Sequence, residues 1–185
     1  MRLRPLVLVL LVAALSGVAG AQQAVRPATR ANPDETPAAM GARLVDGAWD
    51  GRSIPAGQQC KRFGGQGSTP RIALEGYHSG AQVILLAFND ESHEPMNNGG
   101  HGIVGIRING RSATVGSVAG ETALASQSNF VVADNRSGEA PGYLPPCSGG
   151  QGHLYSVTVM AVTWADTNPP SYRVLNQTRV ELGRY

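Results

Sequence analysis

The chain has 185 residues, with 15 lysines and arginines against 13 acidic residues, and only 5% of it is aromatic. This length suits one domain with its own hydrophobic core. The near balance of charge gives no basic surface for nucleic acid and little attraction to an anionic membrane. We therefore expect a small globular protein that does not bind nucleic acid.

The first 21 residues have the pattern of a secretory signal peptide. Arg2 and Arg4 precede an apolar run over residues 6–15, and Ala19-Gly20-Ala21 is a small-residue cleavage site. A membrane span needs roughly 20 apolar residues, more than this run supplies. We predict cleavage near Ala21, no membrane span, and a mature protein that is exported to the periplasm or secreted. Cleavage leaves equal numbers of basic and acidic residues.

Residues 22–41 contain three prolines and no apolar periodicity, which predicts a disordered leader. The folded domain is expected over residues 42–185. Turn residues divide it into short apolar or alternating segments, the pattern of strands. We expect eight strands, over residues 42–45, 53–63, 71–75, 81–90, 101–108, 111–118, 153–162 and 173–180.

Three of these segments decide the fold class. Residues 81–90 form a nearly continuous apolar run, which indicates a central strand covered on both faces. Residues 153–162 alternate and are rich in β-branched side chains. Asn109-Gly110 is a hairpin signal, so residues 111–118 are expected to return antiparallel to residues 101–108. With no long helical pattern, the sequence predicts an all-β Greek-key sandwich with few short helices.

Two cysteines, Cys60 and Cys147, are present. Exported proteins meet an oxidising compartment, and one disulfide between the two is the simplest use. Buried free thiols and a catalytic Cys147–His153 dyad are the alternatives. The dyad is the weakest, because no neighbouring residue is set to orient the histidine.

Residues 141–162 combine a stiff turn with the alternating strand. Prolines and glycines fix the turn, which reads PGYLPPCSGGQG. The strand that follows begins at His153 and Tyr155. We predict a binding site where the turn delivers these two side chains to the mouth of the strand.

Four stretches, in order over residues 58–163, resemble the phosphatidylethanolamine-binding protein (Raf kinase inhibitor-like) family. They are the Cys60 to Pro70 segment, the strand that runs into Asp90-Glu-Ser-His-Glu-Pro95, the His101-Gly-Ile-Val strand, and Pro146-Cys147 with Gly152-His153-Leu-Tyr155. The chain is similar to divergent exported bacterial members. The resemblance implies the family's type of β-sandwich.

The resemblance also implies a small pocket for phosphate or a phosphorylated head group. It would be formed by Asp90, His101, Pro146, His153 and Tyr155, with Tyr185 as a possible addition. Imidazole and phenol groups can donate to phosphate oxygens, and Asp90 can fix the tautomer of a histidine. Asp90 also has a plain alternative as a turn cap, and His101, His153 and Tyr155 have one as ordinary strand residues.

The segment after Asp90 departs from the family pattern. Ser92 replaces its second acid, His93 replaces its alanine, and its proline is displaced to Pro95. We expect His93 and His78 to lie on surface loops. A metal site built from Asp90, His93, His101 and His153 is disfavoured, because the sequence has no close ligand spacing.

The expected function is an exported, non-catalytic ligand-binding module for a small anionic or phosphorylated ligand, with no metal and no cofactor. The family's association with kinase and protease inhibition gives an alternative, a protein partner bound through the loop at residues 91–100. A hydrolase that uses the histidines ranks last, because no nucleophile elbow, phosphate loop or dinucleotide motif is present.

Overall fold

The computed structural model describes residues 39–108, 113–125 and 128–185, which lie within a compact unit, Thr36–Tyr185. The predicted signal peptide and the leader up to residue 38 lie outside the described residues. The strands form from short apolar runs that lie between glycine and proline turns. These runs are rich in β-branched side chains, which favour the extended conformation. The elements are β1 (Gly41–Leu44), η1 (Lys61–Phe63), β2 (Ile72–Glu75), β3 (Val83–Asp90), η2 (Glu94–Met96), β4 (Ile103–Arg107), β5 (Ala113–Val115), β6 (Asn129–Ala133), β7 (Leu154–Ala165) and β8 (Ser171–Arg184).

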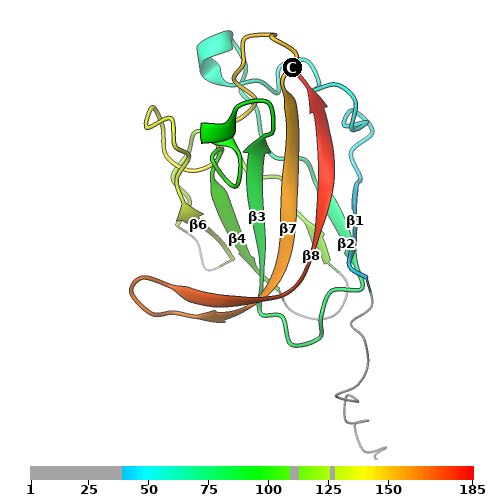
Figure 1. Cartoon of the computed structure of the whole chain (residues 1–185), viewed down its shortest axis with the longest axis vertical. Coiled ribbons are helices and arrows are strands. Elements are labelled where there is room, and N and C mark those ends of the chain that lie inside the picture. The colour runs from blue at the N-terminus through cyan, green and yellow to red at the C-terminus, as the bar shows by residue number, and fades with distance from the viewer. Residues whose placement is uncertain (1–38, 109–112, 126–127) are drawn as a thin grey trace, which may run out of the picture. The chain divides into compact units, whose positions relative to one another are not determined.

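The strands form two antiparallel sheets, with the order β1-β2-β5 in one and β6-β4-β3-β7-β8 in the other. This arrangement confirms the predicted all-β sandwich, and the two short helices are 3-10 turns. The end of β3, the start of β7 and the end of β8 meet at one end of the larger sheet, beside the labelled C-terminus (Figure 1). Within the described residues, no helix is long and apolar enough to cross a membrane.

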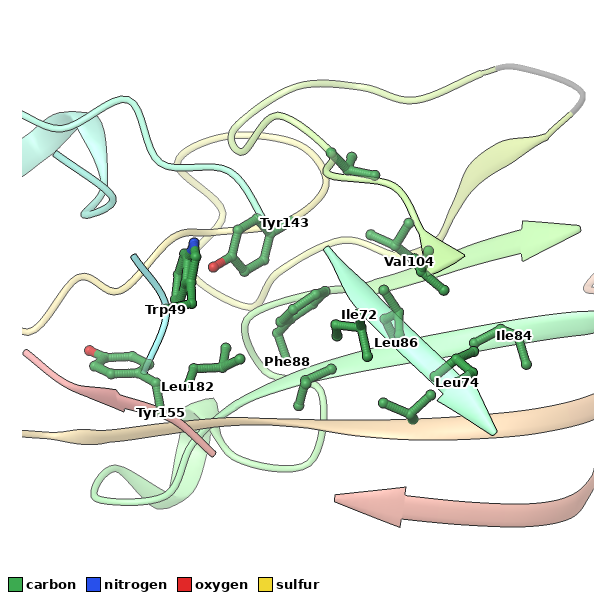
Figure 2. Close-up of a cluster of buried hydrophobic side chains, with 14 of the residues drawn as sticks. Trp49, Ile72, Leu74, Ile84, Leu86, Phe88, Val104, Tyr143, Tyr155 and Leu182 are labelled. Atoms are coloured by element: carbon green, nitrogen blue, oxygen red, sulfur yellow. The ribbon is translucent and has the colours of Figure 1, made fainter. Parts of the chain in front are cut away.

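The main core fills the space between the sheets. Its side chains alternate along β3 (Ile84, Leu86, Phe88) and β7 (Val157, Val159, Ala161), and they meet Ile72 and Leu74 of β2. Figure 2 shows Phe88 within this cluster, with Ile84 toward one end and Tyr155 and Trp49 at the other. Trp49 is buried in this core as well.

The opposite face of the larger sheet is also covered. Val83, Leu85 and Val162 are buried there beneath Phe130 and Trp164. All eight residues of β3 are therefore buried. This confirms that the apolar run marks a central strand covered on both faces.

The outer face of β3 ends in a polar group. The Asn89 amide donates to the hydroxyls of Ser156 (3.2 Å) and Thr158 (3.3 Å). The Ser156 hydroxyl donates in turn to Glu91, which also accepts from Arg179. Because side chains alternate across a strand, Asp90 faces the other side, the side of the main core.

The strand predicted over residues 53–63 is wrong. Ser53 makes only an isolated bridge to Arg184, and Lys61–Phe63 is a 3-10 turn. The backbone there bonds locally, because Pro55 closes one turn with Gln58 and Cys60 closes the next with Phe63. Proline and glycine in this stretch favour turns over an extended ladder.

The predicted pairing of residues 101–108 with residues 111–118 is also wrong. Residues 109–112, which include Asn109-Gly110, lie outside the described residues. β4 pairs with β3 and β6, whereas β5 pairs with β2 in the other sheet. The chain therefore crosses between sheets here, and Val115 and Val118 enter the main core.

Candidate functional site

The candidate site is a cluster of side chains around the Asp90–His153 pair, at the end of β3. His153 Nδ1 lies 2.7 Å from Asp90 Oδ2, and the Asp90 side chain is 5% exposed while that of His153 is 24% exposed. The other carboxylate oxygen of Asp90 accepts from the Ser92 amide at 2.9 Å. Because the carboxylate accepts, Nδ1 of His153 carries a proton, and Nε2 is the ring nitrogen left for a ligand.

His101 lies behind this pair and is buried. Its Nδ1 donates to the Leu144 carbonyl at 2.8 Å, because a carbonyl can only accept. Burial lowers the pKa of His101, against smaller upward effects from the Leu144 bond and the Asp90 charge. The ring is therefore held neutral with its lone pair on Nε2.

A close backbone approach explains how His101 reaches the turn. Gly102 has φ 105°, and a Cβ there would lie 2.6 Å from the Gly142 carbonyl oxygen. This contact lets the chain from Gly142 pack against the start of β4, where the Leu144 amide donates to the His101 carbonyl at 2.8 Å. Glycine is needed for both the left-handed φ and the space.

Tyr155 joins the cluster to the core. Its ring packs edge-to-face on His101, with centroids 5.3 Å apart, and its hydroxyl accepts from the Cys147 amide at 3.1 Å. Burial raises the pKa of Tyr155 to about 12, and the nearby Asp90 charge adds to the rise. The phenol therefore keeps its proton near neutral pH and remains a donor.

The predicted disulfide joins Cys60 to Cys147. It fixes the turn beside the cluster, where the Cys60 amide donates to the Pro146 carbonyl at 3.0 Å. Pro146 is buried and acts as a wall of this turn. The pairing leaves no free thiol, so the alternative of a Cys147–His153 dyad is wrong.

Tyr185 reaches the cluster through its backbone. It exchanges two hydrogen bonds with His153, from the His153 amide to the Tyr185 carbonyl (2.9 Å) and from the Tyr185 amide to the His153 carbonyl (3.1 Å). The same carbonyl accepts from the Ser148 hydroxyl at 2.6 Å. Its ring is partly buried against the main core. Tyr185 thus fixes the backbone of His153.

The structure brings together all the predicted residues, Asp90, His101, Pro146, His153, Tyr155 and Tyr185. His93 lies exposed on a surface loop, as expected, and this loop carries it to the cluster. The His93 ring lies 6.5 Å from the His153 ring, centroid to centroid. The sequence feature that could have indicated this is the Asp-x-Ser turn after a buried strand, because such a turn folds the residues that follow, here His93, back over the aspartate. His78 lies exposed in the loop before β3, as expected.

The described residues were also compared with the side-chain sets that bind metal ions. Among the described residues, no set of three or more histidine, cysteine, aspartate and glutamate side chains has a geometry suited to a metal ion. The Asp90 carboxylate is already engaged by His153 and Ser92.

No protein-family model matches the sequence, and no curated protein matches it. The structure is similar to a crystal structure from Chlamydia trachomatis described as a phosphatidylethanolamine-binding protein homologue. The TM-score is 0.53 at 23% identity, over 80% of this chain and 97% of that chain. At this identity the likeness establishes the fold, a phosphatidylethanolamine-binding-protein-like sandwich, as the sequence motifs predicted.

Proposed function

We propose that the Asp90–His153 cluster is a non-catalytic binding site for a small phosphate-type anion. The observation that carries the proposal is the pair itself. Asp90 is buried and holds Nδ1 of a part-exposed His153. The carboxylate accepts from Nδ1–H and leaves Nε2 for a ligand, and in a doubly protonated imidazole Nε2–H is a charged donor to a ligand oxygen.

Two further groups support this role from behind the pair. The Tyr155 phenol stays protonated, because burial and the Asp90 carboxylate both favour its neutral form, and it packs behind the pair. His101 is neutral and buried, and its edge-to-face contact fixes the Tyr155 ring. Oxyanions of tetrahedral shape accept several hydrogen bonds at once, and a charged imidazole can supply one of them.

The nearby hydroxyl groups favour binding over hydrolysis. The Ser148 hydroxyl donates to the Tyr185 carbonyl, and the Ser92 hydroxyl accepts from the Leu154 amide at 3.0 Å. A serine nucleophile needs a hydrogen bond to its base. In the part of the chain that the structure describes, neither hydroxyl has such a bond to His153.

We propose further that the protein acts outside the cytoplasm. The disulfide closes a separation of 87 residues and holds the turn beside the cluster. Disulfides of this kind persist in oxidising compartments. Together with the signal-peptide pattern of residues 1–21, the disulfide supports an exported binding module.

The test is an NMR titration of the oxidised protein with phosphate and phosphoethanolamine. We expect shifts centred on His153 and Tyr155, with a dissociation constant on the order of 1 mM, since one charged donor gives modest affinity. His153→Asn should abolish them, because asparagine can still donate to Asp90 but cannot become charged. His78→Asn is the matched control and should bind normally.

Two results would overturn the proposal. One is an absence of localised shifts at ligand concentrations of tens of millimolar, roughly tens of times the expected dissociation constant. The other is steady hydrolysis of phosphate or carboxylate esters that disappears in His153→Asn, because that result would make the pair a catalytic base.

A further inference from the structure

His93, exposed on the loop after β3, has its ring beside that of His153 in the proposed site. The loop after β3 turns back at once, because the Ser92 amide donates to Asp90 Oδ1 (2.9 Å) and the His93 amide to the Asp90 carbonyl (3.4 Å). The Ser92 hydroxyl accepts from the Leu154 amide. These bonds fasten the loop to the start of β7, and they set the His93 ring beside that of His153.

The far side of this loop is held by Arg136. Its guanidinium donates to the carbonyl oxygens of Pro95 (2.9 Å), Asn97 (3.0 Å) and Asn98 (3.1 Å). The Met96 amide donates to the His93 carbonyl at 2.8 Å, which closes η2. The backbone of His93 is thus fixed at both ends, although its side chain is exposed. A fixed backbone lowers the cost of ordering the ring around a ligand.

The distance between the two rings suits a shared ligand. Centroids 6.5 Å apart leave the rings too far apart for a direct hydrogen bond. An oxyanion between them can accept from both, since each N–H···O bond adds about 2.9 Å. Within the described residues the His93 ring nitrogens have no hydrogen-bond partner, so both are available to a ligand.

The charges around His93 decide which ligand fits. Asp90 at the end of β3 and His153 at the start of β7 form one ion pair, and buried His101 stays neutral. Glu91 is occupied by Arg179 on the outer face of the sheet. On the loop itself Glu94 is exposed, and the Arg136 guanidinium keeps its positive charge but donates to backbone carbonyls on the far side of the loop.

We propose that His93 is a second charged donor of this site and makes it select phosphate monoesters, which carry two negative charges, over phosphodiesters. This inference rests on the proposed anion site. Protonated His153 and Asp90 together have no net charge, so the pair alone discriminates only weakly between a dianion and a monoanion. Protonated His93 adds one positive charge, which a dianion gains from more than a monoanion does.

The pH dependence follows from the same chemistry. Imidazole side chains gain their second proton in the mildly acidic range. Affinity for an anion of fixed charge, such as sulfate, should therefore rise as the pH falls. A metal ion would show the opposite trend, because it needs the unprotonated nitrogen.

The test compares wild type with His93→Asn, and uses His78→Asn as the matched exposed control. Phosphoethanolamine (a monoester), glycerophosphoethanolamine (a diester) and sulfate are titrated by NMR at about pH 6 and about pH 8. We expect His93→Asn to weaken monoester and sulfate binding about three- to ten-fold at the lower pH. Diester binding should change less than about two-fold, and His78→Asn should match wild type.

The outcomes separate this inference from the proposed function. If His93→Asn keeps the wild-type affinities and monoester preference while His153→Asn loses them, the role of His93 is refuted and the anion site stands. If wild type shows no localised shifts with any of the three anions, both fail. A third outcome is that Zn²⁺ binds at the higher pH only when His93 is present, while wild type and His93→Asn bind the anions equally. In that case the site is a metal site and the inference is wrong.

Discussion

The Cys147 amide donates to the Tyr155 hydroxyl over 3.1 Å, so the disulfide-bonded turn and the buried phenol are fixed to each other. The turn comes from the loop before β7, and the phenol comes from β7 itself. Through Tyr155 the contact extends to His101, whose ring packs against the phenol. The covalent bond thus acts on the geometry of the proposed site as well as on the stability of the fold.

Loss of the disulfide should destabilise the protein by about 2–5 kcal/mol, because the unfolded chain regains the freedom of a long loop. The measurement is urea unfolding of the oxidised and reduced wild type. A Cys60→Ser/Cys147→Ser double variant should match the reduced protein. Equal free energies of unfolding for all three would contradict the prediction.

Tyr155→Phe should lower the free energy of unfolding by about 1–3 kcal/mol, because the Cys147 amide loses its acceptor. Tyr172→Phe, at a side chain that is 42% exposed, is the matched control and should change it little. Both variants are compared by urea unfolding at neutral pH. A Tyr155→Phe protein as stable as wild type would show that water replaces the hydroxyl without cost.

Alkaline pH should also act through Tyr155. Its pKa is raised to about 12 in the folded protein, from an ordinary value near 10. The folded state therefore favours the protonated phenol, and its contribution is complete below pH 10 and is lost as the pH rises through 12. Stability curves over this range should fall less steeply for Tyr155→Phe than for wild type.

Acid should weaken the fold through His101. Burial lowers the pKa of this imidazole in the folded state, so the unfolded chain binds the proton more readily. The stabilisation is present above the unfolded value of about 6.5 and is lost as the pH falls below it. His101→Asn retains a donor for the Leu144 carbonyl. The free energy of unfolding should fall less between about pH 7 and about pH 5 in this variant than in wild type.

Arg136→Ala should loosen the loop that carries His93 without unfolding the protein. The guanidinium is exposed but binds three backbone carbonyls. Hydrogen exchange of the Met96 and Gly100 amides should speed up, while the amides of β3 keep wild-type rates. Arg136→Lys should behave like Arg136→Ala, because an ammonium group cannot reproduce the planar fork. Unchanged exchange at Met96 in both variants would refute the role.

The sequence was sufficient for the parts of the fold that depend on strand periodicity. The run in β3 and the alternation in β7 are local signals, and both strands lie where they were predicted. The Cys60–Cys147 pairing followed from the number of cysteines and their expected compartment. The site residues came from motif order, which holds information about residues that meet only in the folded chain.

The errors arose where tertiary contacts overrule local patterns. An Asn-Gly pair predicts a hairpin, but β5 gains more by burying Val115 beside β2 in the other sheet. Residues 53–63 contain apolar side chains, yet Pro55 and the bonded Cys60 direct the backbone into turns. His93 lies on the surface as predicted, but its approach to His153 depends on how the loop folds back over Asp90, for which the Asp-x-Ser turn is only a weak local signal.

The polar group on the outer face of β3 limits how the chain around the site can change over evolution. Asn89 and Ser156 are partners in the strand register, and their side chains are bonded. A one-residue insertion or deletion in β3 would exchange the two faces, and would turn Asp90 away from His153. Insertions and deletions should therefore be tolerated in the loop after His93, but not in β3 or between Asp90 and His93. Changes in that loop would then alter what surrounds the Asp90–His153 pair while the pair itself stays in place.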